Sequence, residues 1–266
     1  MDLMLLLKAA VMGLVEGATE FLPVSSTGHL ILVGGLLDYP ERQRVTTEIF
    51  IQLGAILAVF WHYGAALREL GRRAPVDAAA RDLVLKVAVA FVPAALVGLL
   101  FHHAIEERLF NPFGVALALV AGGIVLIAVE RRRVRGTIDD IERIGWGGAI
   151  GIGVAQVASL VPGVSRAGAT IVGGLLVGLD RPAATQFSFY LALPTVSAAS
   201  LFSLVKGLPL LGAADIAPLA IGFLAAFVSA LVVIRSLLVY VQSHDFRVFG
   251  YYRIAVGVLV YLLVVR

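Results

Sequence analysis

The stretch LVEGATEFLPVSSTGHL, residues 14 to 30, decides how this chain folds. Most of its residues are apolar, yet it holds two glutamates, a histidine and a Ser-Ser-Thr run just after a proline. Proline ends or kinks a helix, so Pro23 divides the stretch into a first helix and a shorter second one. Ionisable groups beside such a break, inside an apolar segment, indicate a functional site rather than a simple span.

The rest of the chain is equally apolar. Hydrophobic residues make up 60% of its 266 residues, charged residues make up 15%, and the mean hydropathy is +0.96. Soluble domains usually contain about 25% charged residues. Five segments of about spanning length lack Asp, Glu, Lys and Arg: 87–105, 109–129, 144–165, 182–205 and 216–234. The composition therefore predicts an integral membrane protein with several helical spans.

Composition also excludes some kinds of site and partner. The chain has no cysteine, which excludes disulfides and thiol chemistry. Its net charge of +3 is modest and its basic residues lie in short loops, so we expect no nucleic-acid partner. The N-terminal apolar run lacks a small-residue cleavage pattern, and we expect it to be retained. We expect one membrane domain over residues 1–266.

Two arginine-rich loops, residues 67–86 and 130–143, set the expected orientation. By the positive-inside rule both lie in the cytoplasm, and the connection 102–111 between them lies outside. Counting from these loops predicts six spans, at about residues 48–66, 87–102, 112–129, 183–205, 216–236 and 250–265.

Two apolar stretches remain, residues 1–37 and 144–180, and each is interrupted by Gly, Pro and Ser. Each is predicted to be a re-entrant helical hairpin, because broken backbone at membrane depth needs protein or a polar cavity around it. The segments FLPVSST (21–27) and LVPGVSR (160–166) resemble each other at an offset of 139 residues.

The two hairpins enter from opposite sides in the expected orientation, which is typical of an inverted-topology repeat. The repeat halves are about 1–130 and 144–266. The predicted fold is an all-α polytopic membrane protein with six transmembrane helices and two re-entrant hairpins.

Glu16 and Glu20 are four residues apart and would share one face of the first helix. Carboxylates in an apolar segment repel each other and are costly unless they are paired. We expect a cation between them, either a metal ion or an arginine; otherwise one carboxyl stays protonated. The alternative is a helix end at the membrane interface, where glutamate costs little.

The residues after the proline predict a turn into a short helix, with Ser25, Ser26 or Thr27 as its N-cap. The N-terminus of that helix would present free N–H groups to a phosphate. His29 follows Ser26 by three residues, close enough to act as its base or as an acid to a leaving oxygen. The alternative is that the hydroxyls cap the helix and the histidine packs in the interior.

The second polar stretch, SLVPGVSRAGATIVGG (159–174), contains a lone arginine. Arg166 is preceded by 22 uncharged residues and followed by 13. An intramembrane arginine indicates function, and its planar fork suits bidentate phosphate contact. The alternative is a structural ion pair with one of the two glutamates.

Small and hydroxyl residues surround this arginine. Ser165 and Thr170 offer hydroxyls, while Gly163 and Gly168 would let the backbone approach a ligand. An inverted repeat would bring both hairpins together near the midplane. The combined groups form an anion site with an acid–base group, which suits phosphate chemistry better than sugar or ion transport.

The segments EGATEFLPVSSTGHL and PGVSRAGAT resemble the two signature motifs of the bacterial undecaprenyl-diphosphate phosphatase family, also called bacitracin-resistance proteins. EIFIQLGAILAV (48–59) and FSFYLALP (187–194) are similar to further family segments, so the resemblance covers essentially the whole chain. It implies an inner-membrane hydrolase with its site open to the periplasm. This enzyme removes the terminal phosphate of the C55 isoprenoid diphosphate, which regenerates the carrier for peptidoglycan and other cell-wall precursors and confers bacitracin resistance.

The resemblance also implies a role for individual residues. Glu16 and Glu20 match the family's acidic pair, which is tied to a divalent cation, Mg²⁺ or Ca²⁺. Ser26 matches the proposed nucleophile, His29 the essential histidine, and Arg166 the phosphate-binding arginine. The predicted catalytic set is therefore Ser26, His29, Glu20 and Arg166.

Neighbouring residues complete the expected site. The phosphate-binding set is Ser25, Thr27, Gly163, Ser165, Arg166 and Thr170. Ala167 stands where the family often has serine, which leaves one hydroxyl contact in doubt. The expected partners are undecaprenyl diphosphate and membrane lipids, and a homodimer is a further possibility.

Three other functions compete with this interpretation. An inverted-repeat transporter or flippase for an anionic lipid would need an anion site, but no acid–base group beside a hydroxyl. Type 2 phosphatidic acid phosphatases need a second histidine soon after their Ser-Arg motif, and here the next one is His244, which rejects that class. A purely structural role leaves Arg166 unexplained.

Overall fold

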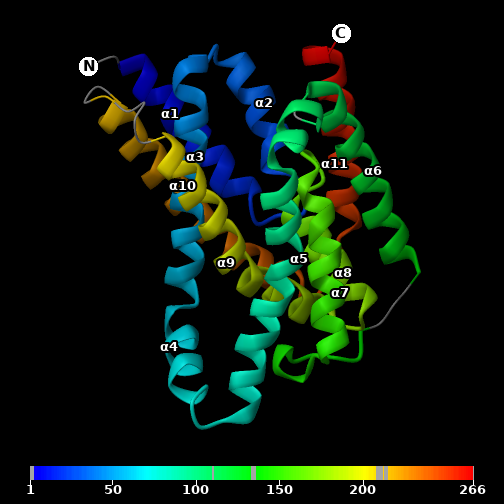
Figure 1. The fold of residues 1–266 in the computed structure, drawn as a ribbon. Helices are drawn as coiled ribbons and strands as arrows, with labels where there is room; N and C mark the ends of the chain where they lie inside the picture. The colour runs from blue at the N-terminus through cyan, green and yellow to red at the C-terminus, as the bar shows by residue number, and fades with distance from the viewer. Residues whose placement is uncertain (1–2, 110, 133–135, 208–211, 213–214, 266) are drawn as a thin grey trace.

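The computed structural model describes residues 3–109, 111–132, 136–207, 212 and 215–265. This part of the chain folds into helices and their connections, with one isolated bridge between Ile138 and Leu179 and no strand (Figure 1). The all-α prediction is therefore confirmed.

The helices follow one another in a simple order along the chain. In the first half they are α1 (Leu3–Thr19), α2 (Ser26–Leu36), α3 (Glu41–His62), α4 (Gly64–Arg73), α5 (Ala78–Leu109) and α6 (Pro112–Arg131). In the second half they are η1 (Ile141–Arg143), α7 (Trp146–Val157), η2 (Ala158–Leu160), α8 (Arg166–Leu176), α9 (Arg181–Gly207), α10 (Ile216–Tyr240), α11 (Arg247–Val260) and a terminal π-helix, η5 (Tyr261–Val265).

Five described helices are long and apolar enough to cross a membrane. They are Ala78–Phe101, Pro112–Arg131, Arg181–Val205, Ile216–Tyr240 and Arg247–Val265. The pair Thr46–His62 and Gly64–Arg73, bent by 64°, makes six if it counts as one span. The protein is thus a multi-pass membrane protein, and each predicted span overlaps one of these elements.

One predicted boundary was wrong, and one helix continues beyond its predicted span. The span predicted over 48–66 ends at His62, where α4 bends away. The connection predicted at 102–111 is largely helical, because α5 continues to Leu109. Charged residues such as Glu and Arg mark the end of the apolar segment, but they are good helix formers and do not end the helix.

Two short helices begin immediately after a broken turn. α2 and α8 each have 11 residues, and each follows a serine with positive φ: Ser25 at 71° and Ser165 at 73°. The two helices start 140 residues apart, not at the offset of 139 found by matching the prolines. Between the proline and the first residue of the short helix, the second turn contains one residue more than the first. Gly163, with φ of 97°, lies in this part of the second turn. Ser26 therefore corresponds to Arg166 as the first residue of its helix.

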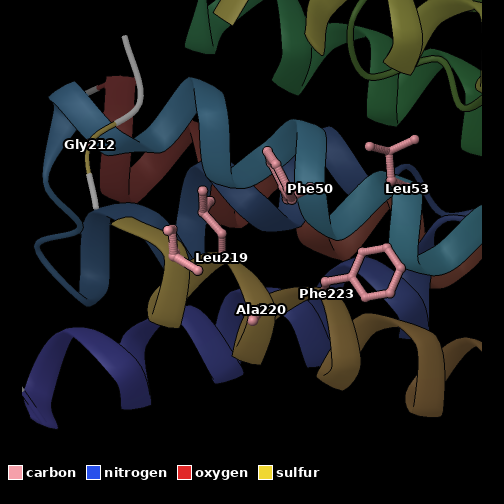
Figure 2. Close-up of a pocket in the computed structure, with 7 residues that line it drawn as sticks. Phe50, Leu53, Gly212, Leu219, Ala220 and Phe223 are labelled. Carbon is pink, nitrogen blue, oxygen red and sulfur yellow. The ribbon is translucent and has the colours of Figure 1, made fainter. Parts of the chain in front are cut away.

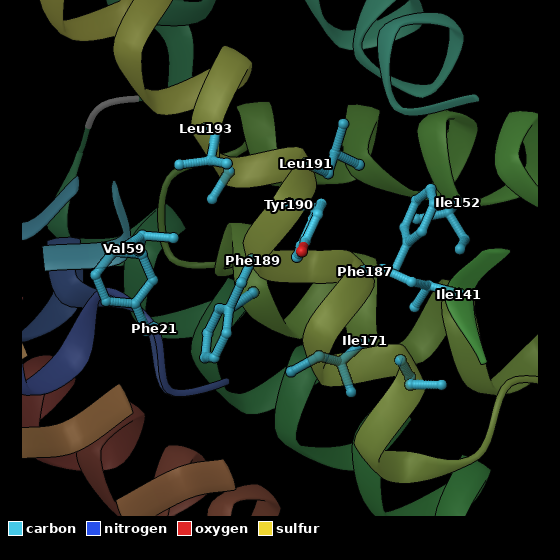
Figure 3. Close-up of a cluster of buried hydrophobic side chains, with 14 of the residues drawn as sticks. Phe21, Val59, Ile141, Ile152, Ile171, Phe187, Phe189, Tyr190, Leu191 and Leu193 are labelled. Carbon is cyan, nitrogen blue, oxygen red and sulfur yellow. The ribbon is translucent and has the colours of Figure 1, made fainter. Parts of the chain in front are cut away.

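The core fixes these turns against α9. Figure 3 shows the largest buried cluster, in which Phe187, Phe189 and Leu191 of α9 are fully buried. Phe21, from the first turn, packs edge-on against Phe189, with ring centroids 5.6 Å apart. Ile171 of α8 belongs to the same cluster. Burial of this apolar surface therefore holds α8 and, through Phe21, the first turn against α9.

Candidate active site

The two broken turns meet at Glu20. Ser26 Oγ donates a hydrogen bond to Glu20 Oε2 at 2.8 Å, and Arg166 Nη2 lies 3.3 Å from Glu20 Oε1. Glu20 and Arg166 are both nearly buried, with side chains 9% exposed. The expected contact between the two polar stretches is present, and the first residues of α2 and α8 share one carboxylate.

The Arg166 guanidinium is held on three sides. Its Nη1 donates to the Ser188 carbonyl at 3.1 Å and to Ser188 Oγ at 3.3 Å, and the Phe21 ring lies 5.7 Å away. The ion pair with Glu20 is the structural alternative raised by the sequence. That pair does not use all five N–H groups, however: Arg166 Nε is buried and has no hydrogen-bond partner. A buried donor without a partner is costly, which indicates a place for an anionic ligand.

Thr170 supports Arg166 in this structure. Its hydroxyl lies 2.7 Å from Ser188 Oγ and 2.9 Å from the Arg166 carbonyl, and the residue is 1% exposed. Its hydroxyl is thus engaged by protein on the interior side of α8. The sequence predicts Thr170 as a phosphate contact, and that role stays a prediction.

Ser165 and Gly163 also serve the protein's own backbone. Ser165 Oγ accepts from Gly168 N at 3.0 Å, so it caps α8. A Cβ atom on Gly163 would lie 2.6 Å from the Val115 carbonyl oxygen, which shows that this glycine permits close packing against α6. Likewise, a Cβ atom on Gly168 would lie 2.8 Å from Nη1 of Arg253. In this structure both glycines lie close to protein groups, and their approach to a ligand stays a prediction.

The hydroxyls of the first turn differ from one another. Ser25 occupies the N-cap position of α2, but its side chain makes no capping hydrogen bond and is 3% exposed. Ser26 follows it and binds Glu20, while Thr27 is half-buried. Among the three candidates, Ser26 is the one in contact with the carboxylate.

His29 and Ser26, which their spacing suggests as a pair, each have another hydrogen-bond partner in this structure. Its Nδ1 lies 2.7 Å from the Ser25 carbonyl oxygen, and its Nε2 lies 2.8 Å from the Tyr252 hydroxyl. Side chains three residues apart on one helix can also hydrogen-bond to neighbouring helices. The spacing alone therefore does not determine the partner of Ser26 or of His29. The group that accepts from Ser26 is Glu20.

The acidic pair offers oxygen ligands for a divalent cation. Glu16 is 2% exposed and lies on α1, four residues before Glu20, which follows the end of that helix. Among the residues that the structure describes, no group of three or more His, Asp or Glu could hold a metal alone. Two carboxylates and the Ser26 hydroxyl nonetheless suit Mg²⁺, which is usually bound through one or two carboxylates and substrate phosphates. The donor set therefore fits a cation that arrives with a phosphorylated substrate.

A second buried arginine was missed by the sequence analysis. Arg253 of α11 is 1% exposed, and it donates to the carbonyl oxygens of Pro23 at 3.3 Å and Gly163 at 2.9 Å. It also reaches the carbonyls of Ala118 and Leu119 on α6. One guanidinium therefore ties both broken turns together. The signal was available, since this arginine lies inside the predicted span 250–265.

A separate pocket of about 270 Å³ lies between α3 and α10 (Figure 2). Phe50 and Leu53 of α3 and Leu219 and Phe223 of α10 line it, and the lining is apolar. No residue of the site described above belongs to it. A phosphate needs charged or hydrogen-bonding partners, so this pocket cannot replace the junction of the two turns as the anion site.

Comparison with known proteins shows the family to which the chain belongs. The family model described as "Bacitracin resistance protein BacA" matches residues 9–259. A protein of Laribacter hongkongensis named "Undecaprenyl-diphosphatase" is 49% identical over 260 residues, which cover 98% of this chain and 95% of that protein. "Undecaprenyl-diphosphatase 2" of Rhodospirillum rubrum is 49% identical over 261 residues, with the same coverage.

A third relative, "Undecaprenyl-diphosphatase" of Nitrosomonas eutropha, is 47% identical over 262 residues, which cover 98% of this chain and 96% of that protein. The match of the family model and these relatives extends over both polar stretches and all the candidate spans. The chain belongs to the bacitracin resistance protein BacA family.

Proposed function

We propose that the protein hydrolyses undecaprenyl diphosphate to undecaprenyl phosphate and inorganic phosphate. This reaction recycles the lipid carrier for peptidoglycan and other cell-wall precursors and accounts for bacitracin resistance. The observation that carries the proposal is the buried Arg166, which has an unpaired Nε–H next to a serine and a carboxylate. The names of the full-length relatives supply the substrate.

In the proposed reaction, the terminal phosphate binds Arg166, and Ser26 Oγ attacks its phosphorus. The Ser26 hydroxyl already donates to Glu20 Oε2, so Glu20 takes its proton as the new O–P bond forms. The bond between phosphorus and the bridging oxygen breaks, and undecaprenyl phosphate leaves with the electron pair of that bond. Water then attacks the phosphorus and gives a proton to His29, Glu20 returns its proton to Ser26 Oγ as the serine–phosphorus bond breaks, and inorganic phosphate leaves.

Arg166 is suited to this step because charge on the transferring phosphoryl group spreads over its oxygens. Ser188 and Phe21 hold the guanidinium in place before substrate binds, so little reorganisation is needed. The competing route is direct attack by water, with Ser26 as a binding group only.

Replacement of Ser26 by alanine tests the covalent route. We expect the rate of phosphate release from the C55 diphosphate to fall about a thousandfold or more, because the nucleophile is lost. The measurement is phosphate release by the purified protein in detergent, where transport cannot occur. Ser236→Ala, an exposed serine of α10, is the matched control and should retain full activity. Activity of Ser26→Ala near that of wild type would exclude the covalent route.

We also propose that Glu16 and Glu20 hold a divalent cation, Mg²⁺ or Ca²⁺, together with the substrate. When bound, this cation would neutralise phosphate charge. Treatment with a chelator is expected to lower phosphate release by at least about tenfold, and added Mg²⁺ should restore it. The control is a zinc-specific chelator, which should have little effect. If activity is unchanged after both treatments, the acidic pair acts without a metal.

The architecture that we propose around this site is an inverted repeat with two re-entrant hairpins, α1–α2 and α7–α8. Two features of the short helices support it: the equal lengths of α2 and α8, and the positive φ of the residue before each. A third is that each hairpin packs against a helix of the other half. α1 packs on α10 as α7 packs on α5, while α3 pairs with α9 and α6 with α11.

This arrangement would place the site near the middle of the membrane. With the arginine-rich loops in the cytoplasm, we propose an inner-membrane location with the site open to the periplasm. A homodimer is a further proposal, which the mass of the detergent-solubilised protein would test.

A further inference from the structure

Tyr252 of α11 is the one side chain that hydrogen-bonds His29 within the described part of the chain. Its hydroxyl lies 2.8 Å from His29 Nε2, although the two residues are 223 positions apart. The two rings are nearly parallel, with an interplanar angle of 10° and centroids 5.5 Å apart. Neither motif of the sequence contains Tyr252, and the reaction described above leaves it without a role.

The other hydrogen bond of His29 fixes which nitrogen carries the proton. Nδ1 lies 2.7 Å from the Ser25 carbonyl oxygen, which can only accept, so Nδ1 must be the protonated nitrogen. In a neutral imidazole the remaining nitrogen, Nε2, is then an acceptor. The Tyr252 hydroxyl therefore donates to Nε2, and this nitrogen holds the lone pair with which His29 can bind a proton.

Tyr252 is held rigidly relative to the two turns. The next residue on α11, Arg253, is fully buried and binds the carbonyls of Pro23 and Gly163, one from each turn. His29 is 9% exposed, whereas Tyr252, which contacts its Nε2, is 45% exposed. The same helix thus anchors both turns and presents a hydroxyl to the histidine.

We propose that Tyr252 is a positioning residue for His29: its hydroxyl holds the imidazole in a single orientation, with the acceptor lone pair on Nε2. This inference rests on the proposed function, in which His29 handles a proton during hydrolysis. Partners that orient a functional histidine through a hydrogen bond are typically worth about 10- to 100-fold in activity. The alternative is that Tyr252 only packs α11 against α2.

Tyr252→Phe keeps the ring contact and removes the hydroxyl, so it separates these two roles. We expect kcat for phosphate release from the C55 diphosphate to fall about 10- to 100-fold with KM unchanged, because Arg166 and not His29 holds the phosphate. Tyr251→Phe, at the neighbouring tyrosine that is 53% exposed, is the matched control and should retain full kcat. An unchanged kcat in Tyr252→Phe would overturn the proposal.

A double-mutant cycle gives a readout that a packing role would not change. In a His29→Ala background, Tyr252→Phe should lower kcat by less than about twofold, since both residues act through one group. Full additivity of the two effects would mean that Tyr252 acts independently of His29. Equal melting temperatures of Tyr252→Phe and wild type in detergent are expected, because the stacked ring remains.

Nitrogen NMR of histidine-labelled protein tests the geometry without any assay of activity. The His29 signals, identified among five histidines by their loss in His29→Ala, should show a protonated Nδ1 and a hydrogen-bonded, unprotonated Nε2. In Tyr252→Phe the Nε2 signal should move toward that of an imidazole nitrogen without a donor. A protonated Nε2 in the wild type, or no movement in the variant, would overturn the inference. Absence of phosphate release by the wild type would instead overturn the proposed function and leave this result intact.

Discussion

Replacement of Arg166 by lysine is expected to lower kcat/KM for phosphate release by about 10³- to 10⁵-fold, in the range of other arginines that stabilise phosphoryl transfer. Lysine retains a positive charge, but it has one nitrogen in place of the planar fork. It could not contact Ser188, Glu20 and a phosphate at the same time, as the Nη1, Nη2 and unpaired Nε groups of arginine can. The measurement is steady-state phosphate release from the C55 diphosphate.

Two comparisons make this result specific. Arg247→Lys, at an arginine whose side chain is 51% exposed at the start of α11, should retain wild-type activity. The melting temperature of Arg166→Lys in detergent should change little, because the lysine still neutralises Glu20. Near-normal hydrolysis by Arg166→Lys, or by Arg166→Ala, would remove the anion site from this junction.

Replacement of Arg253 by lysine is expected to reduce both stability and activity. The arginine donates to four buried carbonyl oxygens, which a single ammonium cannot reach together. Those of Ala118 and Leu119 lie inside α6 and keep their helical N–H donors, whereas those of Pro23 and Gly163 lie in the broken turns. Each buried carbonyl left without a donor costs about 1–3 kcal/mol. For a protein of this size we expect the melting temperature to fall by about 5–10 °C. Because both turns lose a shared anchor, kcat should also fall at least about 100-fold.

The matched control for this variant is Arg235→Lys, at an exposed arginine of α10, which should change neither quantity. Melting in detergent and phosphate release are measured on the same preparations. A variant with normal melting and normal kcat would show that the two turns are held together by the core around α9 alone.

Much of the fold followed from local sequence. Long uncharged segments predicted the spans, and Pro23 with its polar neighbours predicted the first broken turn, because both signals act within a few residues of the backbone. The sequence did not predict that α5 would extend to Leu109, since the end of an apolar segment need not end a helix. The offset of the two turns was wrong by one residue, because matching the prolines ignores the extra residue after the second proline, where Gly163 lies.

For the proposed site, the sequence by itself indicated which residues are candidates for the chemistry. Charged and hydroxyl groups are costly in lipid, so Glu16, Glu20, Ser26 and Arg166 were visible as exceptions in an apolar chain. Only the tertiary structure decided how they are paired: Ser26 with Glu20 instead of His29, and His29 with Tyr252 across 223 residues. Hydrogen-bond partners depend on which helix faces pack together, and no local pattern of spacing or hydropathy specifies that.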